Sequence, residues 1–313
     1  MESTSIINLF PMQLRKKFEV CDVISEGLQE IRIRVGQPVI FVINGKEYFL
    51  EKDGKVGDDV ENAYRITGQE VSEILNHICN YSIYAFEDEI RQGFITVTGG
   101  HRIGIAGQAV MENNDKIRYL KHINYLNIRV AHQKIGVADR VIPRLYKDGR
   151  LCNTLIISPP GCGKTTMLRD LIRQVSNGNK WGEGCDVCVI DERSEIAGSY
   201  QGIPQNDVGM RTDVMDACPK LIGMMMAIRS MAPKVLAVDE LGDRQEMDLL
   251  IKARASGCSI LATIHGDGME DMIRKDYMRT AFETGVFKRY IVMGRKCGIP
   301  DVLEIYDEVM KIC

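Results

Sequence analysis

The feature that most constrains the fold is a glycine- and lysine-containing segment near the middle of the chain, Ser158 to Thr165. It follows the apolar run Leu155–Ile157 and precedes residues that are apolar at helical spacing. This context is typical of a Walker A phosphate-binding loop, although Ser158 stands where the motif has glycine. The glycines let backbone N–H groups converge on phosphate oxygens, and the helix N-terminus favours negative charge. We therefore expect a nucleotide to be bound by Ser158, Pro159, Pro160, Gly161, Cys162, Gly163, Lys164, Thr165 and Thr166.

A second motif, the apolar run Val235–Val238 followed by two carboxylates, is typical of a Walker B strand. By itself this pattern is weak, since many strands end in acidic residues, but a Walker A loop upstream favours a nucleotide site. In such a site Lys164 reaches the terminal phosphates, Thr165 binds Mg²⁺, and Asp239 binds Mg²⁺ through water. Glu240 is then expected to orient or deprotonate the attacking water.

Two further apolar runs also end in polar residues. Val189 and Ile190 lead into Asp191 and Glu192, and a run from residue 260 leads to His265. Short apolar strands that alternate with helices indicate a parallel sheet with crossover connections, and ligands bind at the carboxyl ends of such strands. We expect these three polar residues to lie near Lys164, with His265 touching the γ-phosphate or its water.

Residues 1–130 are expected to form a separate, smaller mixed α/β domain, followed by a second domain over 131–313. Alternating residues predict a strand over 31–35, and the run over 39–43 predicts a strand that ends in a turn at Asn44-Gly45. Thr67 and Glu70 have the spacing of a helix capping box, and Gly99-Gly100 lies between two predicted strands of a hairpin. A helical stretch is expected to end at Leu145.

The charge of the chain and its distribution restrict the kinds of binding partner that we expect. The formal net charge of -3 gives no electrostatic reason to expect nucleic acid as the main partner. A basic stretch from His101 to Arg150 is interpreted either as a solvated face or as a surface that meets phosphate or an acidic partner. It is the sole support for the alternative function, a P-loop ATPase that acts on single-stranded nucleic acid. A GTPase is disfavoured, because no NKxD-type loop follows Gly242.

The ten scattered cysteines are expected to be reduced thiols of a cytosolic protein, and Met1–Phe10 does not have the pattern of a signal peptide. No apolar run is long enough to cross a bilayer. We therefore expect a cytoplasmic protein without a membrane span of its own.

In chain order, four segments resemble the conserved boxes of secretion-type ATPases, which drive type II and type IV secretion and pilus machines. They are the Walker A loop, the acidic stretch Asp191–Glu195, the Walker B strand, and Thr263–Gly266. The chain departs from this group in one respect, since Walker B commonly ends in Gly-Glu there and ends in Asp239-Glu240 here. That departure leaves Glu240 as the expected base and supplies a carboxylate for Mg²⁺ at Asp239.

The resemblance implies an α/β fold, with a RecA-like P-loop motor domain of mainly parallel sheet after the smaller N-terminal domain. It also implies Mg²⁺-dependent ATP hydrolysis by a homo-oligomeric, hexameric ring. In secretion ATPases arginine fingers come from the N-terminal domain, which favours Arg102 and Arg129 here. Within the group the chain is most similar to a sporulation family of endospore-forming bacteria. This implies peripheral association with the inner membrane through a channel protein, and a channel that connects the mother cell with the forespore.

Overall fold

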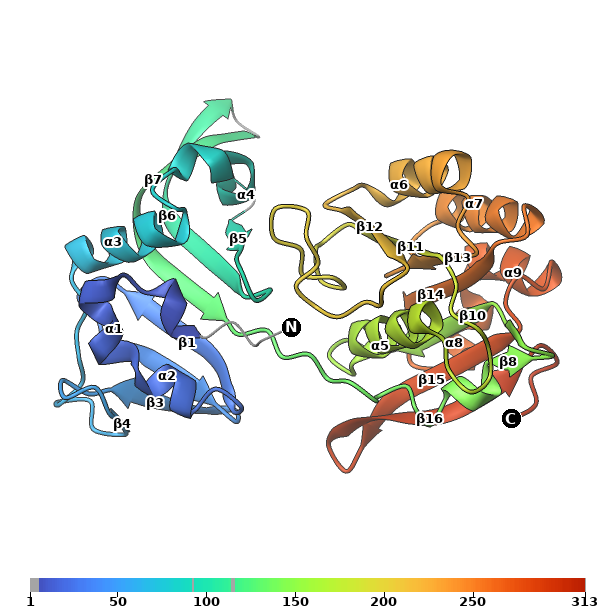
Figure 1. Ribbon diagram of the computed structural model, residues 1–313, viewed down its shortest axis with the longest axis horizontal. Helices are drawn as coiled ribbons and strands as arrows, with labels where there is room; N and C mark the ends of the chain where they lie inside the picture. The colour runs from blue at the N-terminus through green and yellow to red at the C-terminus, as the bar shows by residue number, and fades with distance from the viewer. Residues whose placement is uncertain (1–5, 92, 114–115, 313) are drawn as a thin grey trace. The chain divides into compact units, whose positions relative to one another are not determined.

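The computed structural model describes residues 6–91, 93–113 and 116–312. The chain forms two compact units (Figure 1). The first unit extends to His132 and also includes the later segment Gly198–Gln205, whereas the second comprises Gln133–Ala197 and the chain from Asn206 onward. The sequence predicted a single division after residue 130 and gave no sign that residues 198–205 return to the first unit.

The first unit is built on an antiparallel sheet with the strand order β4-β3-β2-β1-β7-β6-β5. Alternate residues of the central strands, such as Ile31, Ile33, Ile103 and Ile128, are buried on one face, because successive side chains of a strand point to opposite sides. The strands are β1 Leu28–Arg34, β2 Ile40–Ile43, β3 Lys46–Leu50, β4 Val56–Gly57, β5 Phe94–Thr96, β6 Arg102–Asn113 and β7 Lys116–Arg129. The helices are η1 Ile6–Leu9, α1 Met12–Phe18, α2 Val20–Val23, α3 Gly68–Ile78, η2 Ile83–Phe86 and α4 Glu87–Arg91.

Local signals in this unit are confirmed. The side chain of Thr67 accepts a hydrogen bond from the Glu70 backbone, and the Glu70 carboxylate accepts one from the Thr67 backbone, so α3 begins with the predicted capping box. β2 and β3 form a hairpin in which Asn44 and Gly45 have positive φ angles of 49° and 78°, as a two-residue type I′ turn requires. β5 and β6 form the second predicted hairpin.

The second unit contains a sheet with the order β12-β11-β13-β14-β10-β15-β16. All neighbouring pairs are parallel except the last, β15 with β16. The strands are β10 Thr154–Ser158, β11 Val187–Asp191, β12 Thr212–Asp216, β13 Val235–Val238, β14 Ser259–His265, β15 Arg289–Lys296 and β16 Ile299–Asp307. A separate small hairpin, β8 Tyr146–Lys147 and β9 Arg150–Leu151, precedes β10 in the chain. The helices are η3 Ile142–Arg144, α5 Lys164–Asn177, α6 Lys220–Met226, the π-helix η4 Ala227–Met231, α7 Arg244–Ala255, α8 Met269–Arg274 and α9 Asp276–Glu283.

Apolar side chains cover both faces of this sheet. Leu155 and Ile157 belong to a buried cluster with residues of α6, α7 and α9, whereas Ile156 belongs to a second cluster with residues of α5. The parallel order places the carboxyl ends of β10, β11, β13 and β14 along one edge of the sheet. β14 separates the Walker A strand β10 from the Walker B strand β13, and this spacing positions the site.

One predicted element is wrong. The helical stretch expected to end at Leu145 is only the short 3-10 helix η3, in which Pro143 lies in the first turn. Proline lacks an N–H donor, so it cannot continue an α-helix from preceding residues. Among the described residues, no helix is both long and apolar enough to span a membrane.

Candidate active site

The loop predicted to bind phosphate connects β10 to α5. Gly161 and Gly163 have positive φ angles of 69° and 82°, a conformation that glycine adopts without steric strain. No side chain caps the start of α5 in the part of the chain that the structure describes. The first backbone N–H groups of the helix are therefore available to an anion. Ser158 is buried and its hydroxyl donates to the Pro159 carbonyl, so this serine fits where the motif has glycine.

Three of the predicted residues meet at the carboxyl edge of the sheet. The buried Lys164 Nζ donates to Glu240 Oε1 at 2.6 Å and lies 3.0 Å from His265 Nε2. The same His265 nitrogen lies 2.8 Å from Glu240 Oε1. Burial raises the pKa of Glu240, but the hydrogen bond from Lys164 and the nearby positive groups outweigh it, so its pKa lies below the ordinary value. The structure thus joins residues that are far apart in sequence around one ionised carboxylate.

Two oxygen groups beside this junction suit Mg²⁺. Thr165 Oγ1 donates to Asp239 Oδ2 at 2.8 Å, and the Thr263 hydroxyl donates to Asp239 Oδ1. No cluster of three or more His, Cys, Asp or Glu residues with metal-ligand geometry exists among the described residues. Mg²⁺ is commonly held by one or two carboxylates together with substrate phosphates and water, so Thr165 and Asp239 are a fitting pair.

The backbone of Glu240 is also held in place. Its φ angle is 53°, an uncommon value for a residue with a side chain. Its N–H donates to Thr263 Oγ1 at 2.9 Å, and its carbonyl accepts a hydrogen bond from Lys220 Nζ. Lys220 Nζ in turn lies 3.0 Å from Glu246 Oε1. Sequence reasoning did not assign a role to Lys220, because its position behind Glu240 depends on the packing of α6.

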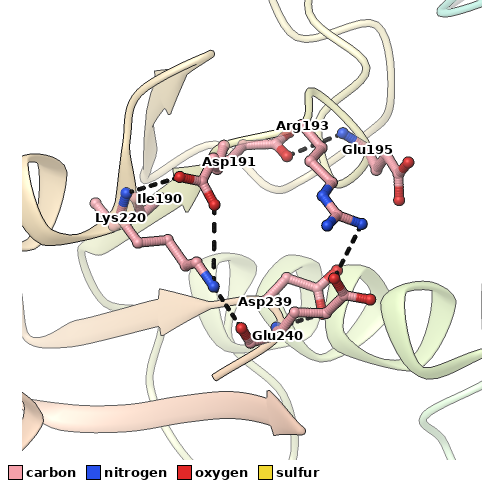
Figure 2. Close-up of a pocket in the computed structure, with 8 residues that line it drawn as sticks. Ile190, Asp191, Arg193, Glu195, Lys220, Asp239 and Glu240 are labelled. Carbon is pink, nitrogen blue, oxygen red and sulfur yellow. Dashed lines mark hydrogen bonds and ion pairs between the residues drawn. The ribbon is translucent and has the colours of Figure 1, made fainter. Parts of the chain in front are cut away.

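The acidic stretch after β11 divides into different roles. Asp191 is only 2% exposed, and its two carboxylate oxygens accept hydrogen bonds from the backbone N–H groups of Glu195, Ile196 and Ala197 at 2.8–3.2 Å. Figure 2 shows the first of these, from Glu195. Burial raises its pKa above the ordinary value, although these hydrogen bonds act against it. The geometry favours a role in holding the loop for Asp191. Glu192 Oε1 instead accepts from the Lys220 backbone N–H at 3.3 Å.

A hollow lies between the acidic stretch and the end of β13. Figure 2 shows Arg193 and Glu240 on opposite sides of it, with Arg193 Nη1 3.0 Å from Glu240 Oε2. Behind the stretch, Arg169 of α5 donates to the carbonyls of Glu195 and Ile196, each at 2.5 Å. Arg193 and Arg169 could not be predicted as site residues, since neither occupies a motif position with an assigned chemistry.

The two arginines predicted as fingers belong to the first unit. Arg102 on β6 and Arg129 on β7 are directly opposite each other in the register of the two strands. The Arg102 guanidinium lies 3.5 Å from the centroid of the Phe94 ring. Arg129 is exposed. Their part in the site stays a prediction.

Comparison with known proteins agrees with this architecture. The family described as sporulation stage III, protein AA, matches residues 2–312. The stage III sporulation protein AA of Bacillus subtilis is 41% identical over 281 residues, which cover 90% of this chain and 87% of that protein. Among solved structures, the ATPase DotB of Legionella pneumophila has a TM-score of 0.62 at 15% identity, covering 96% of this chain and 81% of DotB. The pilus retraction motor PilT, solved with bound ADP, has a TM-score of 0.60 at 14% identity, covering 92% and 81%. The predicted RecA-like α/β fold is thereby confirmed.

Proposed function

The chain belongs to the family of sporulation stage III, protein AA, and from that premise we propose that it binds ATP with Mg²⁺ and hydrolyses it. The observation that carries this proposal is the junction of Lys164, Glu240 and His265 beside the Thr165–Asp239 pair. These are the residue types that phosphoryl transfer to water requires, namely a cation for the phosphates, oxygen ligands for Mg²⁺, and a carboxylate base.

Each residue has a role that follows from its contacts. The amides of the phosphate loop and Lys164 bind the phosphates, and Mg²⁺ held by Thr165 and Asp239 offsets their negative charge. Phosphate oxygens compete with Glu240 for Lys164, because the ammonium lies only 2.6 Å from that carboxylate in the structure. Once Lys164 turns to the phosphates, Glu240 Oε1 becomes available to orient the attacking water and accept its proton. His265 lies beside the same oxygen and contacts the water or the γ-phosphate.

The biological role is proposed from the family and the fold. The chain would act as a homo-oligomeric ring, with six subunits as the family resemblance implies. It would be cytoplasmic and peripheral to the inner membrane of the mother cell, where it would energise a channel to the forespore through a membrane partner. The family match supports the sporulation setting, and the fold shared with DotB and PilT is compatible with a motor.

Two substitutions test the chemistry. Glu240→Gln should bind ATP and lose hydrolysis by about 10²–10⁴-fold, because a neutral amide does not accept the proton of water. Lys164→Ala should lose nucleotide binding itself. Binding is measured by titration with a fluorescent ATP analogue, and hydrolysis by release of phosphate. Glu283→Gln, an exposed carboxylate at the end of α9, is the matched control. Hydrolysis by Glu240→Gln at the wild-type rate would place the base elsewhere, with Glu192 as the next candidate.

A further inference from the structure

Hydrogen bonds from several parts of the chain hold the loop after β11 in place. Asp191 accepts hydrogen bonds from three successive backbone N–H groups of this loop, and Ser194 Oγ donates to Asp216 Oδ1 at 2.6 Å. Arg169 of α5 donates hydrogen bonds to two backbone carbonyls of this loop. None of these contacts involves the side chain of Arg193. The loop therefore has a fixed backbone that presents one arginine to the hollow beside Glu240.

Arg193 differs from the other cation in this hollow. The Lys220 side chain is 14% exposed and is held by the Glu240 carbonyl and by Glu246 at 3.0 Å. The Arg193 side chain is 64% exposed, and within the part of the chain that the structure describes the ion pair with Glu240 Oε2 is the single ion pair or hydrogen bond of that side chain. Because the arginine of this ion pair is largely in solvent, the pair is weak and Arg193 can exchange Glu240 for another anion. The Arg193 side chain can therefore exchange its partner, whereas the Lys220 side chain is held in place by two partners.

The terminal phosphate of ATP would supply that partner. Glu240 joins Arg193 to Lys164, since its Oε2 lies 3.0 Å from the guanidinium and its Oε1 lies 2.6 Å from the ammonium. The lysine of a phosphate loop reaches the β- and γ-phosphates, so the γ-phosphate enters beside this carboxylate, within reach of the arginine. A guanidinium binds phosphate oxygens in a bidentate manner, as it does a carboxylate, and the terminal phosphate of ATP carries more negative charge than one carboxylate.

We propose that Arg193 is an arginine finger that the chain supplies to its own active site, contacting the γ-phosphate once ATP is bound. The inference rests on the proposed hydrolysis of ATP. Transfer of the guanidinium from Glu240 to the phosphate does two things together. It adds positive charge where the transition state develops negative charge, and it releases Glu240 Oε2 so that the carboxylate is free to orient water. Arg193 would act within one subunit, in contrast to fingers that cross between subunits.

The test compares wild type, Arg193→Ala, Arg193→Lys and a matched control, Arg279→Ala. Arg279 is 65% exposed and forms a carboxylate pair with Asp276 on α9. Phosphate release gives kcat and KM, and titration gives the affinities for Mg-ADP and for Mg-ADP with aluminium fluoride, which mimics the transition state. Arg193→Ala should lower kcat by about 10³-fold, as fingers do elsewhere, and weaken binding of the fluoride complex by at least tenfold. Its ADP affinity should be unchanged. Arg193→Lys should recover part of kcat, and Arg279→Ala should resemble wild type.

Two results would overturn this assignment. If Arg193→Ala retains the wild-type kcat, the arginine does not contact the reacting phosphate. If it weakens ADP as much as the fluoride complex, its role is to support the loop. A wild-type protein that releases no phosphate would instead refute the proposed function itself.

Mixing separates action within a subunit from action between subunits. Arg193→Ala combined with Lys164→Ala should show no recovery at any ratio, because every site then lacks one of the two residues. Recovery of activity would mean that Arg193 serves a neighbouring subunit, which also contradicts the assignment.

Discussion

Asp191 and Glu240 both follow buried strands, yet their carboxylates meet opposite surroundings. Glu240 faces cations, and its pKa lies below the ordinary value because those cations outweigh the effect of burial. Asp191 faces backbone N–H groups inside the fold, and burial raises its pKa. At the scale of the residue, a strand end supplies a carboxylate, but the direction of the side chain decides whether it binds a ligand or the protein.

Asp191→Asn tests this distinction. Replacing one carboxylate oxygen by an NH₂ group would set a donor against the N–H groups of Ile196 or Ala197. We expect the free energy of unfolding to fall by about 1–3 kcal/mol, the range for a buried group left without its hydrogen bond. Urea unfolding measures this, with the exposed Asp213→Asn on β12 as the control. Unchanged stability with loss of hydrolysis would support the catalytic role that the sequence predicted for Asp191.

At the scale of the element, α5 combines a proposed binding role at its start with a structural anchor further along the helix. Its N-terminus follows the loop proposed to bind phosphate, and the buried Asp170 accepts a hydrogen bond from the Ala138 N–H at 2.8 Å and pairs with Arg173 at 2.7 Å. Burial raises the pKa of Asp170, but these partners outweigh it and hold its pKa below the ordinary value. Asp170 therefore ties the helix to the segment with which the second unit begins.

This linkage predicts a dependence of stability on pH. Because the folded pKa of Asp170 is depressed, its contribution is present above the unfolded value of about 3.9 and is lost as pH falls through the folded value. Asp170→Asn should be less stable than wild type at pH 7 by about 1.5–3 kcal/mol, the range for hydrogen bonds to a charged group. The difference in the free energy of unfolding between the two proteins should shrink toward pH 3. A difference that stays constant across this range would show that the charge of Asp170 does not stabilise the fold.

At the scale of the whole molecule, the chain passes between the two units three times. The segment Gly198–Gln205 starts directly after Ala197, whose N–H binds Asp191, and it belongs to the first unit. There Tyr200 OH accepts a hydrogen bond from Asn80, and the Gln205 side chain accepts one from the Gly99 N–H. The loop that carries Arg193 is therefore continuous with a segment of the other unit.

The predicted ring is tested by mixing variants of both units. Arg102 and Arg129 are directly opposite on neighbouring strands, an arrangement of like charges that is unfavourable unless an anion offsets it. If Arg129 is a finger that acts between subunits, Arg129→Ala and Lys164→Ala should each lack activity and regain part of it when mixed, because mixed rings contain some intact composite sites. Phosphate release across mixing ratios gives the result. Absence of recovery, with exchange of subunits confirmed, would exclude this role for Arg129.

The sequence by itself determined the local parts of the molecule. The loop between β10 and α5, the strand β13 that precedes Asp239 and Glu240, and the capping box of α3 were all predicted, because each depends on neighbouring residues and on the period of a strand or helix. The carboxyl edge of the sheet also followed, since parallel strands end on the same side.

Only the tertiary structure decided which side chains meet there. The contact of Lys164 with Glu240 spans 76 residues and depends on β14 lying between β10 and β13. The inward turn of Asp191, the exposed position of Arg193 and the return of residues 198–205 to the first unit depend on packing between distant segments. Motifs predicted that Lys164, Glu240 and His265 share one edge of the sheet, but periodicity and motif spacing describe residues that are close in the chain and do not specify which atoms are in contact.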